Sequence, residues 1–356
     1  MKSTRHPLGR QAVAWLVVAA FALQPTATLV VANPENPEVR HGDVEFNFDN
    51  PGELFIDQFS DKAIIDWESF SIDAGELTRF IQNDSGSIAL NRVFTGAPSE
   101  IHGQLQANGQ LFLINPNGIL VGLSGQIDTA GFLASTLDVD DAQFLNGGDM
   151  TFSGGSSAAV VNLGTINAVD GGDIFLIAKS VTNEGTLNAN EGTVGLAAGS
   201  EVRVAAAGDE RVTIAPGGEG TVTNKGAINA MTAELKAAGG NQYALAINNE
   251  GMVRARSFQR RGGRLYLGAN GGRIVNSGQM RASNSVSINN PSGSAEIGGN
   301  VRIEYEEVGG VMTIAASNVK ILGEAVLDVS GAEAGAVAIA ATESAQIDGA
   351  VQGSPK

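Results

Sequence analysis

The chain has 356 residues, of which 43% are hydrophobic and 5% aromatic, with 47 glycines, no cysteine and a formal net charge of −16. The hydrophobic content excludes disorder as the default state, and the acidity excludes nucleic acid as an expected partner. Many glycines with few aromatic rings indicate a repetitive β structure with many tight turns.

Residues 1–32 have the composition of a secretory signal peptide. Three basic residues precede an apolar run from Ala12 to Leu23, and a signal-peptidase site fits at Val30-Val31-Ala32. The apolar run is shorter than the roughly 20 residues that span a bilayer. We therefore expect cleavage rather than a membrane anchor, and a mature protein that leaves the cytoplasm.

Residues 33–110 have a less regular pattern than the rest and carry most of the large side chains, including Phe46, Trp67 and Phe80. A chain that coils into a solenoid needs a segment that covers its first exposed strands. We expect these residues to form an N-terminal β cap and the first coils.

A tight turn is predicted at Asn115-Pro116-Asn117-Gly118. Asparagine suits the first position of a type I turn, proline presets the second, and glycine suits the fourth. Apolar residues lie on both sides, at 111–114 and at Ile119-Leu120. The turn is therefore expected to be a corner between two strands.

The residues offer little support for catalysis. His41 and His102 have no evident partners, and neither a histidine metal-ligand pair nor a phosphate-binding Gly-rich loop occurs. Asp138, Asp140 and Asp141 form the nearest carboxylate cluster of the kind that glycoside hydrolysis needs, but their alternating, turn-like stretch favours solvated loop acids. We expect no enzyme, no metal site and no cofactor.

An internal repeat determines the expected fold. The repeat reads as an apolar strand, an Asn-x-Gly corner and a short strand ending in alanine. Its asparagines are Asn162, Asn183, Asn224, Asn249 and Asn276. Strands this short gain a neighbour above and below only in a stacked coil, so the repeat predicts an all-β parallel β-helix. We expect the corners to use a left-handed backbone, which asparagine and glycine tolerate.

One step of the repeat is long. Between Asn183 and Asn224 it is 41 residues, about two periods. This spacing predicts a degenerate extra coil near Val202 to Ile214. Two separate β-sandwiches are the alternative fold.

Arginines gather between residues 251 and 290, where no acidic residue occurs. They are Arg254, Arg256, Arg260, Arg261, Arg264, Arg273 and Arg281. On adjacent coils the first five would form a patch for acidic glycans, lipopolysaccharide phosphate or a transporter surface. A solvated loop that bulges from the coil is the alternative.

The segment 88–137 resembles the haemagglutination-activity domain of filamentous haemagglutinin-like exoproteins, the secreted members of two-partner secretion systems. The resemblance rests on Ile88-Ala89-Leu90-Asn91-Arg92-Val93, Pro98-Ser99-Glu100-Ile101-His102-Gly103, Leu113-Ile114-Asn115-Pro116-Asn117-Gly118-Ile119-Leu120 and Leu133-Ala134-Ser135-Thr136-Leu137. It covers about residues 35–155, and the coils up to about 290 resemble the remainder of such a secretion domain.

The resemblance implies a right-handed parallel β-helix and a route of export. The chain would enter the periplasm unfolded and be recognised by the periplasmic recognition modules of a cognate outer-membrane barrel transporter. It would then pass through the barrel and fold outside a Gram-negative cell. Asn91, Arg92, Val93 and the corner from Asn115 to Leu120 would form the secretion motif. The resemblance also implies adhesin or haemagglutinin-type binding, with host-cell or bacterial surface glycans as candidate partners.

Three parts are expected: a signal peptide at 1–32, a two-partner secretion domain at 33–290, and further coils at 291–356 that begin a short or truncated passenger. The alternative function is a secreted β-helical enzyme that degrades polysaccharides, which would need a cleft of carboxylates on one face. An inert structural fragment is the third interpretation.

Overall fold

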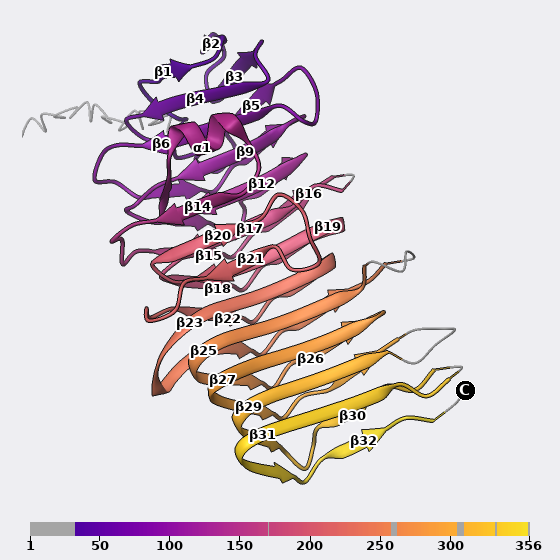
Figure 1. Ribbon diagram of the computed structural model, residues 1–356. Helices are drawn as coiled ribbons and strands as arrows, with labels where there is room; N and C mark the ends of the chain where they lie inside the picture. The colour runs from indigo at the N-terminus through magenta and orange to yellow at the C-terminus, as the bar shows by residue number, and fades with distance from the viewer. Residues whose placement is uncertain (1–32, 170, 258–261, 305–309, 332, 355–356) are drawn as a thin grey trace, which may run out of the picture. The chain divides into compact units, whose positions relative to one another are not determined.

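The computed structural model describes residues 33–354 except 170, 258–261, 305–309 and 332 (Figure 1). All but one of the regular elements in the described residues are β-strands, and these wind into the predicted right-handed parallel β-helix. Successive coils place their strands in three stacks, which we name sheets 1, 2 and 3, and the strands within each stack pair in parallel.

Sheet 1 contains β3 (Glu53–Gln58), β5 (Leu77–Ile81), β8 (Gln104–Ala107), β11 (Gln126–Thr129), β16 (Thr165–Ala168), the opening parts of β19 (Thr186–Ala198) and β23 (Ala227–Asn249), β24 (Met252–Ala255), β26 (Gln279–Ala282), β28 (Val301–Ile303), β30 (Val326–Asp328) and β32 (Ala350–Gln352). Sheet 2 contains β4 (Lys62–Trp67), β6 (Ile88–Val93), β9 (Gln110–Ile114), β12 (Gly131–Ser135), β17 (Ile174–Ala178), later parts of β19 and β23, and the opening parts of β25 (Arg264–Asn276), β27 (Ser285–Ile297), β29 (Val311–Ile321) and β31 (Ala336–Ile347). Sheet 3 contains β7 (Ser99–Ile101), β10 (Ile119–Val121), β15 (Ala159–Asn162), β18 (Ser180–Asn183), β22 (Thr221–Asn224) and the closing parts of β23, β25, β27, β29 and β31.

An N-terminal cap precedes the regular coils, as expected. Strand β1 (Glu38–His41) pairs antiparallel with β4, and β2 (Val44–Asn47) pairs antiparallel with β3. The ring of Phe46 packs edge-on against Trp67, with 5.6 Å between the ring centroids. The cap thus supplies partners for the first strands and apolar cover for the first coil.

The repeat asparagines form a buried ladder inside the coil. Asn162, Asn183, Asn224, Asn249 and Asn276 are all 0% exposed. The side-chain amide of each of the first four donates to the side-chain oxygen of the next, over distances of 2.8, 2.8, 2.7 and 2.6 Å. Each coil therefore satisfies a buried polar group of its neighbour.

The expectation of a left-handed backbone at these corners is wrong. Among the described residues the only non-glycine with a positive φ is Asn36, and the repeat glycines do not have one either. Close packing explains the glycines instead: a Cβ on Gly185 would lie 2.1 Å from the carbonyl oxygen of Gly164, and a Cβ on Gly226 would lie 2.0 Å from that of Gly185. Only glycine allows the coils to approach this closely.

The degenerate coil expected between Asn183 and Asn224 is also absent. Asn183 pairs directly with Asn224, so the 41-residue step is a single coil with an insertion. The insertion contributes β20 (Glu201–Val204) and β21 (Val212–Ile214), which pair antiparallel outside the coil. Strand β20 also pairs antiparallel with β14 (Met150–Ser153), which pairs with β13 (Asp138–Val139).

These four strands and helix α1 (Asp141–Asn146) cover the outer face of sheet 2, and we call them the extra-helical element. A second hydrophobic core lies beneath it, separate from the core inside the coil. Asp140 caps α1 by accepting from the backbone N–H groups of Ala142 and Gln143. Within the described residues, no helix is both long and apolar enough to cross a membrane.

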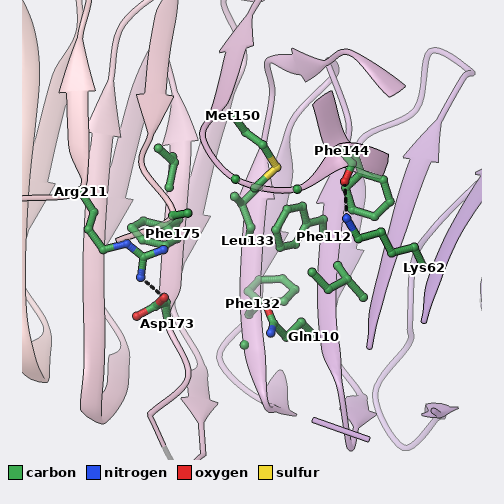
Figure 2. A pocket seen from close by; sticks show the side chains of 16 residues that line it. Lys62, Gln110, Phe112, Phe132, Leu133, Phe144, Met150, Asp173, Phe175 and Arg211 are labelled. Atoms are coloured by element: carbon green, nitrogen blue, oxygen red, sulfur yellow. Dashed lines mark hydrogen bonds and ion pairs between the residues drawn. The ribbon is translucent and has the colours of Figure 1, made fainter. Parts of the chain in front are cut away.

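A cavity of about 290 Å³ lies beside this second core. Figure 2 shows the side chains that line it. Phe112, Leu133 and Phe175 line it from sheet 2. At one end the Lys62 ammonium donates to the Phe144 carbonyl over 2.9 Å, and at the other end Arg211 pairs with Asp173. Both cations therefore tie the extra-helical element to the coil.

Candidate functional site: the predicted secretion motif

Asn91 lies in the middle of β6 with its side chain inside the coil, where it is 0% exposed. Its side-chain oxygen accepts a hydrogen bond of 2.9 Å from the indole N–H of Trp67. Its amide donates to the carbonyl oxygens of Ala89 and Phe112. Asn91 therefore joins three successive strands of sheet 2, because Trp67 belongs to β4 and Phe112 to β9.

Arg92, the next residue, points outward from sheet 2 to the extra-helical element. Its Nε donates to Asp138 over 2.8 Å, Nη2 donates to the carbonyl of Val139 over 2.6 Å, and Nη1 binds Asp141. Burial alone would lower the pKa of Arg92, but the hydrogen bonds that Arg92 donates to Asp138 and Asp141, together with the negative charges of these carboxylates, outweigh it and raise the pKa overall. Arg92 is thus a charged clamp at the start of α1.

Asp66 is in register with Arg92 on the preceding coil. Burial raises the pKa of Asp66, an effect partly offset by the positive charges of Arg92 and Arg40. The Oδ1 atom of Asp66 is buried and has no hydrogen-bond partner in the described part of the chain. Strand register places Asp66 beside Arg92, and the other carboxylate oxygen, Oδ2, lies 3.7 Å from the Nε of Arg40.

The predicted turn at Asn115-Pro116-Asn117-Gly118 is present, because the N–H of Gly118 donates to the carbonyl of Asn115 over 3.1 Å. The Asn115 amide donates to the Ala97 carbonyl and the Ser99 hydroxyl, each over 3.0 Å. Its side-chain oxygen accepts from the backbone and side-chain N–H groups of Asn117. Gly118 has a φ of +117°, which favours glycine.

The nine motif residues lie on neighbouring coils but do not form an exposed patch. Arg92 is in register with Ile114, which directly precedes the turn. Only Pro116 is exposed, while Arg92, Asn117 and Leu120 are half-buried. The buried members are Asn91, Val93, Asn115, Gly118 and Ile119. Most of the motif is thus committed to internal contacts in the folded chain.

Sequence reasoning missed two sets of residues that complete this site. Trp67 was expected only as a bulky residue of the cap, although it is the hydrogen-bond donor to Asn91. Asp138 and Asp141 were considered as a carboxylate cluster, and the structure places both on Arg92. The alternation of acidic and apolar residues around Asp138 was the only local signal for the contacts with Arg92. No group of acids, histidines or cysteines suited to a metal ion occurs among the residues that the structure describes.

The arginines of the predicted anionic-ligand patch are divided between two faces. Arg254 and Arg256 lie in and directly after β24 of sheet 1, and Arg256 pairs with Glu304 over 2.9 Å. Arg264 lies on sheet 2 and pairs with Asp209 of the insertion. Arg260 and Arg261 lie outside the described residues.

The described chain is thus a capped parallel β-helix whose Asn-Arg-Val strand and Asn-Pro-Asn-Gly corner lie on neighbouring coils. A family model described as "TPS secretion domain" matches residues 47–282. The chain belongs to this family, whose members carry the secretion domain of two-partner secretion.

Two curated relatives are similar in sequence, and both are named "Heme/hemopexin-binding protein". One, from Haemophilus influenzae strain Rd, is 31% identical over 250 residues, covering 67% of this chain and 27% of the relative. The other, from Haemophilus influenzae, is 38% identical over 107 residues, covering 30% of this chain and 12% of the relative. The chain therefore matches about a quarter or less of each relative's length.

A solved structure, the HMW1 secretion domain from Haemophilus influenzae, has the same fold. The match has a TM-score of 0.67 at 23% identity and covers 90% of this chain and 100% of that domain. The likeness supports the β-helix independently of the repeat pattern.

Proposed function

We propose that this chain is an exoprotein exported through a cognate outer-membrane barrel transporter that has periplasmic recognition modules. The family match over residues 47–282 carries the proposal. After cleavage of residues 1–32 in the periplasm, the mature chain passes the outer membrane of a Gram-negative cell and is secreted or remains at the cell surface. The expected cleavage site falls outside the described residues.

The transporter meets the chain before the coils form. In the folded chain the amides of Asn91 and Asn115 are 0% exposed and hydrogen-bonded within the protein. A partner that contacts these side chains must therefore reach them in an extended chain, where strand-prone segments can add to a transporter sheet edge. Once the chain has folded, the same asparagines shape the corner and the neighbouring coils.

Binding to the purified recognition modules tests this order of events. Chain diluted from urea should bind the immobilised modules, and the signal should decay at the rate at which the coils refold, measured by circular dichroism. Asn115→Ala and Asn117→Ala should weaken the first binding. Asn224→Ala removes an asparagine outside the motif that is as buried as Asn115, and it should leave the first binding unchanged. Equal binding of the native chain would contradict recognition before folding.

In this proposal the exported protein is also an adhesin that binds glycans on host cells or bacteria. Arg254, Arg281 and Arg302 are in register on three coils of sheet 1 in an otherwise acidic protein, which supports an anionic ligand. The comparisons give no support to the alternative of a polysaccharide-degrading enzyme. The carboxylates considered for it bind Arg92 or cap α1.

The domain boundary near residue 290 belongs to the same proposal. The secretion domain occupies 33–290, and the coils at 291–356 begin a passenger. Strand β27 crosses this boundary, from Ser285 to Ile297, and pairs with strands on both sides. Coils beyond 290 can therefore stack on the secretion domain without a linker.

A further inference from the structure

The cavity under the extra-helical element lies where one side chain is missing from the outer face of sheet 2. Four of its lining residues are in register on successive coils: Lys62, Ile88, Gln110 and Gly131. A Cβ on Gly131 would lie 3.2 Å from the Cγ of Gln110, so a side chain there would continue this column. The φ of Gly131 is not positive, and the backbone therefore does not require glycine. The glycine leaves a gap in the column, and the cavity occupies that gap.

The floor and the roof of this cavity are apolar. Phe112, Leu133 and Phe175 line it from three successive strands of sheet 2 (Figure 2). Phe144 and Met150 line it from the extra-helical element. Its volume is about 290 Å³, whereas ~150 Å³ is enough to hold a benzene ring in an apolar protein interior. Three strands spaced as in other sheets give it a length of about 10 Å. The cavity is thus suited to an elongated apolar group rather than to a single ring.

Lys62 is a cation without an anionic partner at one end of this cavity. Its ammonium donates to the carbonyl oxygens of Phe144 and Leu145, over 2.9 and 2.8 Å, and forms no ion pair with a carboxylate of the described residues. An ammonium has three N–H donors, so one remains. At the other end the Arg211 guanidinium is already paired with Asp173. The charge that a ligand can match therefore lies at the Lys62 end.

Gln110 supplies a second polar group, in the same column as Lys62. Its side-chain amide donates to the Ser85 carbonyl over 3.4 Å, which is long for an N–H···O hydrogen bond. A carboxylate accepts hydrogen bonds more strongly than a carbonyl does. The Gln110 amide can therefore exchange its weak internal bond for one to an anionic head group.

We infer that this cavity binds one medium-chain fatty acid. The carboxylate lies at Lys62 and Gln110, and the alkyl chain lies along Phe112 and Leu133 toward Phe175. An alkyl amine would set a second cation beside Lys62, and a neutral alcohol would leave the ammonium without a counter-charge. The net charge of −16 repels the same anion from the rest of the surface, which confines binding to the cavity.

Calorimetric titration of the purified full-length protein with hexanoate, octanoate and decanoate, below their micellar concentrations, tests the apolar part of the site. Affinity should rise about fourfold for each methylene that the cavity buries. Octanoate should bind at least about tenfold more tightly than 1-octanol, because its carboxylate makes charged hydrogen bonds. The titration needs no transporter, so the inference goes beyond the proposed export and can fail without it.

Gly131→Leu should fill the cavity and weaken octanoate binding at least about 30-fold, the equivalent of two to three buried methylenes. The strand accepts leucine at this position because the φ of Gly131 is not positive. Gly268→Leu is the matched control: it places the same side chain on the outer face of sheet 2 in β25, away from the cavity. This control should bind octanoate like the wild type.

Lys62→Met should weaken octanoate binding at least about tenfold and leave 1-octanol binding unchanged. Lys62→Arg keeps the charge and the donors and should retain most of the affinity. Lys179→Met removes a cation that pairs with Glu219 elsewhere and should have no effect. Thermal unfolding of every variant verifies the fold.

Hydrogen exchange on the wild type locates the ligand without any substitution. Octanoate should slow amide exchange in residues 146–150, which line the cavity between α1 and β14. No octanoate binding by the wild type, equal affinity for octanoate and 1-octanol, unchanged binding by Gly131→Leu, or slower exchange only in other segments would overturn the inference. Tighter binding to phosphatidylglycerol vesicles that depends on Gly131 would also overturn it, because the cavity would then serve a membrane lipid.

Discussion

At the scale of single residues, buried polar groups decide how the coils are held. The asparagine ladder and Asn91 form hydrogen bonds to neighbouring coils inside the β-helix. Glu234 forms its hydrogen bonds on the outer face of sheet 2. Glu234 lies in β23, is 0% exposed, and accepts the backbone N–H groups of Arg211 and Val212 over 2.7 and 3.0 Å. A buried carboxylate thereby holds the insertion against the coil.

Glu234 should give the protein a specific pH response. Burial raises its pKa above the ordinary value of 4.5, although the two backbone hydrogen bonds counteract this. The folded state therefore holds the proton more tightly than the unfolded chain. The contribution of Glu234 to stability is complete below pH 4.5, and it is lost as the pH rises through the pKa that Glu234 has in the folded protein.

In Glu234→Gln this contribution is absent. The free energy of unfolding is measured by urea titration at pH 5 and pH 7. Between these pH values the variant should lose less stability than the wild type, or gain more. The control is Glu219→Gln, because the side chain of Glu219 is 71% exposed. This variant should leave the difference in unfolding free energy between the two pH values unchanged. An identical pH response in Glu234→Gln and wild type would show that the carboxyl does not titrate as described.

At the scale of elements, the local repeats predicted the coils well and the extra-helical element not at all. The coils follow from an alternating pattern that each segment carries by itself. The pairing of β14 with β20 joins segments some 50 residues apart, and neither shows a local signal for its partner. The backbone at the asparagine corners was also mispredicted, because the ladder depends on the neighbouring coil rather than on the corner.

In the motif, too, local structure was predicted from the sequence and contacts between distant residues were not. The turn at residues 115–118 was predicted from its own four residues, and it is present. The contacts of Asn91 with Trp67 and of Arg92 with Asp138 connect residues 24 and 46 positions apart. Such contacts require the register of the coils, which the sequence pattern specified only approximately.

Arg92→Met should loosen the extra-helical element while leaving the coil intact. The variant keeps an apolar stem but loses three hydrogen bonds to Asp138, Val139 and Asp141. We expect the local opening free energy to fall by about 2 kcal/mol, which accelerates amide exchange roughly 30-fold. Hydrogen exchange should show this acceleration over α1 and β14.

The amides of β6 and β9 should keep their protection in the same experiment. Arg79→Met, which removes an arginine that binds Gln106 on sheet 1, is the control and should leave α1 protected. If α1 exchanges at the wild-type rate in Arg92→Met, the arginine is not the clamp that the contacts indicate.

At the scale of the whole molecule, the stability of stacked coils accumulates from neighbour to neighbour. Each coil buries its asparagine and its apolar residues only when the adjacent coil is in place. On the proposed export route, an unfolded chain can therefore remain extended in the periplasm, and folding outside the cell can favour outward movement by removing the exported species. The N-terminal cap supplies strand partners for the first coil.

Export in the presence and absence of the transporter tests the central claim most directly. The measurement is the amount of mature chain in the medium and at the cell surface, for wild type, Asn115→Ala, Asn117→Ala and Asn224→Ala, with the unfolding midpoint of each purified variant. The wild type should appear outside only with the transporter. The two motif variants should lose more export than Asn224→Ala of comparable stability. Export of the wild type without the transporter, or export of all three variants in proportion to stability alone, would contradict this account.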